Sequence, residues 1–256
     1  MPRFRTLAIA TLACDLLIAG QAQGKVSPAM SKIEDFYHQG VPARCIRLVG
    51  TSATSPAPHS PDVLHGMIIV KVRDFLGIAE AGAHVVLDFN YAGAPCVDSK
   101  LCLASVPGQT LTCSGGVKQI SGTTDGFGNA TFTVLGASDN PGSTSSGHVA
   151  PYATTACCAV IADGLLLGTK QVAILDQNGS LPGGDGVNGA DARIIMSGVI
   201  ATLAGQPYLP RLDVNCDGAV DGADASYELA CVVEALAGAG SGSGCHADAP
   251  AGYCPP

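Results

Sequence analysis

The chain has few of the residues on which several common functions depend. Its 256 residues include no tryptophan, and aromatic residues make up 5% and charged residues 13%. Glycosidases usually hold sugars on aromatic side chains, so this composition disfavours them. Acidic residues outnumber basic ones, 21 to 13, giving a formal charge of −8, whereas nucleic-acid binding needs a basic surface. No run of about 18 apolar residues follows residue 22, so we expect no membrane span in the mature chain.

Motifs of common catalytic centres are also missing. The chain has no G-x-S-x-G serine elbow, no H-E-x-x-H helix and no P-loop lysine. His84 falls within an expected strand and His148 beside a Ser/Gly loop, and neither has a partner motif. Asp88 and Asp125 are the carboxylates nearest to strands, but an exposed strand position and a turn already explain them. We expect a protein that is not an enzyme, with an unrecognised hydrolase as the least favoured alternative.

The N-terminus has the pattern of a secretory signal peptide. Arg3 and Arg5 precede an apolar stretch, residues 6–19, which Asp15 interrupts, and a small-x-small cleavage pattern ends at residue 22. We therefore assign residues 1–22 to a signal peptide. The mature protein is expected to be secreted, and to be extracellular or held at a cell surface.

Cysteines predict disulfide bonds in the exported chain. Removal of Cys14 with the signal peptide leaves an even number of the 11 cysteines, as expected for an oxidising compartment. A zinc site is the alternative, but Cys96 and Cys102 are too far apart for a C-x2–4-C pair, and Cys157 and Cys158 are adjacent. The pairing of the cysteines stays open.

The middle of the chain alternates short apolar runs with glycine-containing turns. With 33 glycines and 47% hydrophobic residues, the composition suits a turn-rich β architecture. The expected strands are residues 45–50, 67–73, 84–90, 117–121, 130–135, 158–162 and 168–175. Strands of this number and pattern predict a mainly β fold arranged as a β-sandwich.

Four stretches of this region carry a resemblance to a known domain. Residues 69–74 (IVKVRD), 83–88 (AHVVLD), 124–133 (TDGFGNATFT) and 162–168 (ADGLLLG) are similar to the bacterial immunoglobulin-like domains of the invasin and intimin type. The resemblance spans residues 43–175, after an N-terminal segment of residues 23–42. It implies an immunoglobulin-like β-sandwich that acts as a spacer or an adhesive surface. A cysteine-rich insertion over residues 96–113 departs from a minimal domain of this type.

Residues 213–224 (DVNCDGAVDGAD) have the spacing of a calcium-binding loop. Loop positions 1, 3, 5, 7, 9 and 12 hold Asp213, Asn215, Asp217, Ala219, Asp221 and Asp224. Calcium takes six to eight oxygen ligands, which these side chains and the Ala219 carbonyl can supply, and Gly218 at position 6 permits the sharp turn. We predict a Ca²⁺ site here; a solvated Asp/Asn-rich turn is the alternative.

Two features distinguish this loop from an EF-hand. Position 12 is Asp224 instead of the longer glutamate, and Pro207 and Pro210 argue against a helix before Asp213. A calcium loop that is followed, but not preceded, by a helix resembles the repeat of dockerin modules, which occurs in two copies. The resemblance implies a small helical module over residues 176–238, folded around calcium.

A second copy lies upstream, where N-G-A-D-A at residues 188–192 matches D-G-A-D-A at residues 221–225 with an offset of 33. Apolar residues at intervals of four in the helix after the first copy, Ile195, Val199 and Leu203, predict a face that packs on the second helix. Each copy is too small to bury a core alone, so the pair is expected to fold as a unit.

The first loop is less regular than the second. Its expected ligands are Asp176, Asn178 and Ser180, but Asp191 follows Asp176 after fifteen residues instead of eleven, so calcium binding here is expected to be weaker. Residues 184–189 also match G-x-G-x-x-G. The acids around that motif would repel a phosphate, and no alternating strand-helix pattern supports a nucleotide fold.

These features favour a secreted, non-catalytic modular protein that binds calcium and docks a partner. The dockerin resemblance implies a cohesin-like or cell-surface protein partner, and a cellulosome-type component that also binds carbohydrate is the alternative. Loop positions 10 and 11 are Gly222 and Ala223, repeated as Gly189 and Ala190, where clostridial dockerins commonly have hydroxyl pairs. A Gly/Ser/Cys tail, residues 239–256, completes the chain.

Overall fold

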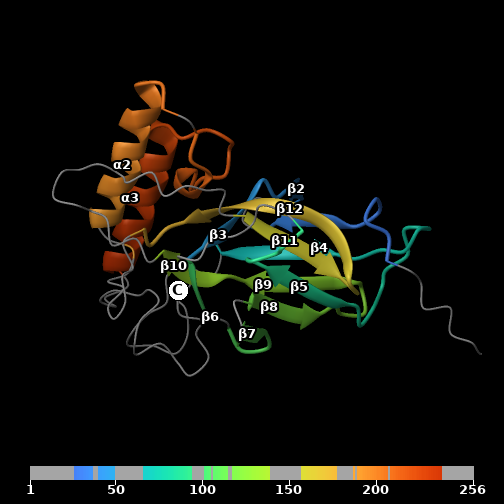
Figure 1. Cartoon of the computed structure of the whole chain (residues 1–256). Helices are drawn as coiled ribbons and strands as arrows, with labels where there is room; N and C mark the ends of the chain where they lie inside the picture. The colour runs from blue at the N-terminus through green and yellow to red at the C-terminus, as the bar shows by residue number, and fades with distance from the viewer. Residues whose placement is uncertain are drawn as a thin grey trace, which may run out of the picture.

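A computed structural model describes residues 26–36, 40–49, 66–93, 101–104, 106–114, 117–138, 157–177, 187, 189–206 and 208–237. This part of the chain is mainly β, as the sequence predicts, and two helices follow the strands (Figure 1). No described helix is long and apolar enough to cross a membrane.

One sheet has four strands in the order β2-β1-β4-β9. They span Val41–Pro42 (β2), Lys32–Asp35 (β1), Met67–Lys71 (β4) and Asn129–Thr133 (β9). All neighbours are antiparallel, and Lys71 of β4 lies beside both Lys32 of β1 and Asn129 of β9. The start of β1, the end of β4 and the start of β9 therefore share one end of the sheet.

The other large sheet has six strands in the order β3-β12-β11-β5-β8-β7. They span Cys45–Leu48 (β3), Leu165–Ile174 (β12), Cys157–Ala162 (β11), His84–Asp88 (β5), Val117–Thr123 (β8) and Thr110–Ser114 (β7). Strands β3 and β12 are parallel, and the other neighbours are antiparallel. A two-stranded sheet pairs β6 (Leu101–Ala104) with β10 (Leu135–Ser138).

The two large sheets share one hydrophobic core. Val70 of β4 and Phe132 of β9 belong to the same buried cluster as Leu87 of β5 and Val160 of β11, and none of these side chains is more than 1% exposed. Burial alternates along β4, as expected of a strand with one face on a core. The shared core is the reason why the two sheets fold together.

Every strand expected from the sequence is present, with ends shifted by a few residues. Five further strands of the described residues were not expected, namely β1, β2, β6, β7 and β10, the last of which overlaps an expected strand only at Leu135. Strand β1 falls within residues 23–42 and pairs with β4, so this segment contributes to the sheet. Strand β6 falls within the insertion over residues 96–113, and β7 covers its end and forms an edge of the six-stranded sheet.

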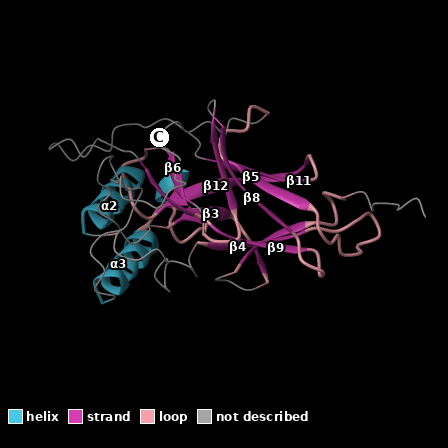
Figure 2. Cartoon of the chain, turned by 90° about the horizontal axis from the view of Figure 1, so that it is seen from below, coloured by secondary structure: helices cyan, strands magenta, loops and turns pink. Residues whose placement is uncertain are grey.

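Helices α2 (Gly189–Leu203) and α3 (Gly222–Ala237) pack side by side at one end of the sheets (Figures 1 and 2). Their contact is built on a second hydrophobic cluster that includes Ile195, Val199 and Val232. The same cluster contains apolar residues from the strand region, namely Val49, Leu135 and Leu175. The helices are therefore joined to the β region by a continuous apolar contact.

Candidate calcium loop

The loop of residues 213–224 begins after a single 3-10 turn, Pro210–Leu212 (η1), and ends where α3 begins. No α-helix directly precedes it among the described residues, as the two prolines predict. Gly218 at loop position 6 has a φ of +95°, a conformation that glycine adopts readily, and Cys216 at position 4 has a φ of +63°. The backbone therefore reverses sharply at the point where the spacing predicts a turn.

The carboxylates at the two ends of the loop are buried and face its backbone. Asp213 is 2% exposed and accepts the N–H groups of Asp217 (3.0 Å) and Gly218 (2.9 Å). Asp224 is fully buried and accepts the N–H groups of Asn215 (3.2 Å) and Asp221 (2.8 Å). These bonds draw positions 1 and 12 toward the same stretch of backbone, as a calcium loop requires.

The remaining predicted ligands lie nearer to the solvent. Asn215 is half-buried, whereas Asp217, Ala219 and Asp221 are exposed. The Asn215 side chain donates to Asp217 (2.9 Å), and Asp217 in turn accepts the Ala219 N–H (2.9 Å). Among the described residues, no three His, Cys, Asp or Glu side chains are gathered tightly enough to form a metal cluster. The loop nevertheless offers only oxygen donors, which suits a hard cation such as calcium.

Burial and mutual repulsion act on the acids of this loop. Burial raises the pKa of Asp224 to about 6, and the charges of Asp213 and Asp217 add to the rise against hydrogen bonds from the backbone. Burial also raises the pKa of Asp213, with a contribution from Asp217. A bound divalent cation would relieve this repulsion, because it favours the charged form of every carboxylate around it.

These shifts predict a pH dependence of the metal-free protein. Asp224 has a pKa of about 6 in the fold against 3.8 for an ordinary aspartate, so it stabilises the fold below its unfolded pKa and loses this contribution as the pH rises through 6. We expect unfolding by urea in calcium-depleted buffer to require less denaturant at about pH 7.5 than at about pH 5. In the Asp224→Asn variant, the urea midpoint should change less with pH than in the wild type. If the midpoint changes equally with pH in both proteins, Asp224 is not the source of the pH dependence.

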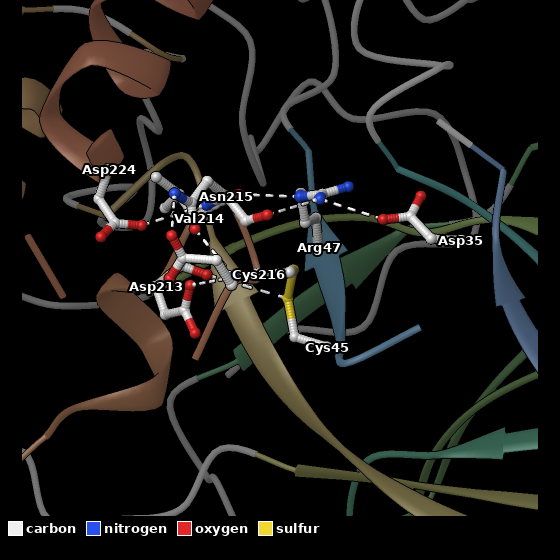
Figure 3. A network of polar contacts seen from close by, with 9 residues as sticks. Asp35, Cys45, Arg47, Asp213, Val214, Asn215, Cys216 and Asp224 are labelled. Atoms are coloured by element: carbon white, nitrogen blue, oxygen red, sulfur yellow. Dashed lines mark hydrogen bonds and ion pairs between the residues drawn. A yellow bond between two sulfur atoms is a disulfide. The ribbon is translucent and has the colours of Figure 1, made fainter. Parts of the chain in front are cut away.

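Three residues of the β region hold the loop in place, and Figure 3 shows two of them, Cys45 and Arg47. Arg47 of β3 is 4% exposed, and its side chain donates to the carbonyls of Val214 (2.8 Å) and Asn215 (3.1 Å). The Arg44 guanidinium donates to the carbonyl of Asp217. Cys45 forms a disulfide with Cys216, across 171 residues of sequence. These contacts could not be predicted from the sequence, because no local pattern links residues so far apart.

Tyr208 is another functional side chain that no sequence pattern indicates. Its hydroxyl donates to the Asp213 carboxylate at 2.6 Å. Burial, followed by this bond and the nearby acids, raises the pKa of Tyr208. The tyrosine therefore orients the first predicted ligand of the loop.

In the first loop, the structure describes Asp176 and Asp191, whereas Asn178 and Ser180 lie outside the described residues. Both aspartates are fully buried. Asp191 accepts the N–H of Gln177 at 2.7 Å, so the acid at the start of α2 lies against the residue that follows Asp176. This contact parallels the one between Asp224 and Asn215 in the second loop. The Gln177 side chain also donates to the Arg211 carbonyl (2.9 Å), which places the two loops next to each other.

The helices are apolar on their outer faces as well as their inner ones. Leu203 was expected to pack between the helices, but it is 82% exposed because the buried face of α2 ends at Val199. An outward stripe instead combines large apolar residues of both helices at the same repeat positions, namely Met196, Ile200, Leu229 and Val233. Gly189, Ala190, Gly222 and Ala223 are exposed at the start of this face.

The acids weighed as catalytic candidates have structural partners. Asp88 is 8% exposed and accepts the Gln119 side-chain amide (2.8 Å) and the Asn90 N–H (2.9 Å). Asp125 accepts the N–H groups of Phe127 and Asn129 within its own turn. His84 is exposed in β5, and His148 lies outside the described residues.

The structure contains disulfides, as the cysteine count predicts, but not every described cysteine forms one, because Cys158 and Cys231 are buried thiols. Cys113 and Cys157 are disulfide-bonded. Burial raises the pKa of the Cys158 thiol.

Comparisons of the chain with protein-family models, with curated proteins and with solved structures found no match.

Proposed function

We propose that this chain is a secreted, non-catalytic modular protein whose dockerin-like repeat pair binds calcium. In this proposal an immunoglobulin-like β-sandwich serves as spacer or adhesive domain, and the helical module docks a protein partner. The observation that carries it is the placement of Asp213 and Asp224, the first and last acids of the loop, buried on the same stretch of backbone.

Calcium binding is supported by what each group in the second loop can do. Asp213, Asn215, Asp217 and Asp224 would supply side-chain oxygens, Ala219 its carbonyl, and Asp221 an oxygen directly or through water. Calcium would neutralise acids that otherwise repel one another. Tyr208 orients Asp213, and Arg47 and Arg44 hold the loop backbone from outside.

Duplication supports the dockerin-like assignment. Each loop starts with a buried acid, Asp176 or Asp213, and each following helix has a buried acid in its first turn, Asp191 or Asp224. In both copies that helical acid accepts an N–H from the start of its loop. The two helices pack against each other, as expected of a pair that folds as one unit.

Strand order supports the immunoglobulin-like assignment. If β1, β4 and β9 are assigned as strands A, B and E, they lie next to one another in one sheet in that order. Strands β12, β11 and β5 then take the places of G, F and C in the other, the arrangement found in immunoglobulin-like domains.

The outward stripe on α2 and α3 supports docking of a protein partner. Surface helices normally turn charged or polar residues to the solvent, but this face exposes Ile200 (62%) and Val233 (63%) at equivalent repeat positions. A cohesin-like or cell-surface protein would bury such a face. A carbohydrate ligand for the sandwich has no comparable support among the described residues.

Calcium titration calorimetry on the whole chain tests the proposal. The whole chain is needed because the module shares apolar contacts and a disulfide with the β region. We expect Asp213→Ala and Asp224→Ala to abolish the stronger binding event, and Asp176→Ala to affect only a weaker one. Calcium at about 100 times its Kd should stabilise the fold by about 2.7 kcal/mol and raise the melting temperature by several degrees.

The matched control is Glu80→Gln, which removes a carboxylate remote from both loops. It should leave the titration unchanged. If the wild-type chain takes up no calcium at millimolar concentration, or if Asp176→Ala removes the stronger event, the assignment of the second loop as the principal site is wrong.

A further inference from the structure

Strand β12 is longer than the strand that covers one of its two edges. Strand β11 pairs with β12 from Leu165 to Gln171, whereas β3, on the other side, pairs with it only from Gln171 to Ile174. Among the described residues, no strand lies beside the first half of β12 on the β3 side. We call this stretch, residues 165–170, the open edge of β12.

The backbone of the open edge has hydrogen-bonding groups that no described strand takes up. The Leu175 N–H, just past β12, donates to the Leu48 carbonyl of β3 (3.0 Å). Backbone groups along a strand alternate between its two sides, so the N–H and C=O of Thr169 face the same side as those of Leu175. Strand β3 does not extend as far as Thr169. An edge of this kind is a template for pairing with another extended chain.

A cavity of about 330 Å³, which we call the edge cavity, lies against the open edge. Its described lining residues are 167–170 of β12, 31–34 at β1, and Gly40 and Pro42. Part of the lining is apolar, because Ile33 and Leu167 also pack in the core that the two large sheets share. Ligand pockets commonly have volumes of roughly 300–1,000 Å³, so the edge cavity has room for part of a binding partner.

The charged groups that line the edge cavity are mainly cationic. Lys32 is exposed and Lys170 is half-buried, and neither forms an ion pair with a described residue. The Lys170 ammonium group donates to the Ala43 carbonyl, and burial lowers the pKa of Lys170. Glu34, the acid of the described lining, is already paired with Lys71 at 2.6 Å. The edge cavity therefore attracts a negative group, although the whole chain has a charge of −8.

An extended peptide that contains acidic residues fits these features together. Its backbone would continue the sheet at Thr169, and such strand addition gains affinity from main-chain hydrogen bonds. It would also bring apolar side chains to Ile33 and Leu167, and carboxylates to the two lysines. A small anion would meet the lysines but would leave the open edge without a strand.

We propose that the open edge of β12 binds an extended acidic segment of a partner protein, which pairs with the backbone at Thr169 and places carboxylates beside Lys32 and Lys170. This site is separate from the outward stripe on α2 and α3, and it requires no calcium.

Fluorescence anisotropy with labelled peptides and the whole chain tests this site. A peptide in which valine and glutamate alternate should bind, and a peptide with lysine in place of glutamate should not. Two further versions of the Val/Glu peptide are N-methylated, one at its valines and the other at its glutamates. Because only every second N–H of an added strand faces β12, the affinities of these two versions should differ by about tenfold.

Variants of the chain test the same contacts from the other side. Thr169→Pro removes the N–H of the open edge, where proline is tolerated, and should weaken binding of the Val/Glu peptide by about tenfold. Thr169→Val keeps this N–H and should bind like the wild type. Lys32→Gln combined with Lys170→Gln should also weaken binding by about tenfold. The control Arg193→Gln, which removes an exposed cation from α2, should have no effect.

Several outcomes would overturn the proposal. They are the absence of binding at millimolar Val/Glu peptide, equal affinities of the two N-methylated versions, and loss of binding in the Ile200→Ser and Val233→Ser double variant, which would place the peptide on the helices. Displacement of the peptide by acetate, without any effect of N-methylation, would assign the edge cavity to small anions instead. If Thr169→Pro fails to fold, the N-methylated peptides decide, because they leave the protein unchanged.

Discussion

Replacing Arg47 by alanine should destabilise the protein by about 3–5 kcal/mol, the typical loss when one partner of a buried ion pair is removed. The Arg47 guanidinium lies 3.1 Å from Asp35, and the two side chains are 2% and 8% exposed. Its removal leaves the Asp35 charge buried and takes donors from the carbonyls of Val214 and Asn215. It also removes a cation from above the Tyr227 ring, 5.4 Å from the ring centre.

Urea unfolding provides the measurement, and an ion pair within the four-stranded sheet provides the control. Lys71 lies 2.6 Å from Glu34, but its side chain is 34% exposed. Lys71→Ala should therefore cost less than about 1 kcal/mol. If Arg47→Ala lowers stability no more than Lys71→Ala does, the buried contact of Arg47 with the loop does not contribute substantially to stability.

Strands with alternating burial were predictable, because the apolar positions of β4 recur with the period that a core-facing strand requires. Strand β1 (KIED) was missed because three of its four residues are charged, although Asp35 is buried by its pairing with Arg47. Strand β7 was missed because it is an exposed edge strand without a buried apolar face. Both β1 and β7 form because of tertiary contacts, which a local sequence pattern does not contain.

Some features of the candidate site could likewise be predicted from the sequence, and others could not. The second loop could be predicted because its acids, its glycine and its turn lie within twelve consecutive residues, so spacing alone describes the geometry. Leu203 was misplaced because the apolar period continues past the point where α2 stops contacting α3. The contacts from Arg44, Cys45 and Arg47 depend on β3 lying beside the loop, which only the fold determines.

The cysteine count predicted disulfides but not the pair that joins Cys45 to Cys216. Serine at both positions should destabilise the chain by about 3–5 kcal/mol, because this bond closes a loop with a sequence separation of 171 residues in the unfolded state. The expected measurement is a lower midpoint in urea under non-reducing conditions. A loss below about 1 kcal/mol would contradict it.

In the proposed calcium-binding function, the same double variant should also weaken calcium binding, on the order of tenfold, because Cys216 stands at loop position 4 with a φ of +63° and is joined to β3 by the disulfide. Cys158→Ala is the matched control. It removes a fully buried sulfur from the core of the β region and lowers stability, but it leaves the loop anchored. If the double serine variant and Cys158→Ala weaken calcium binding equally, the loss of binding follows from lower global stability. If only the double serine variant weakens it, the disulfide to the β region positions the loop for the proposed ion.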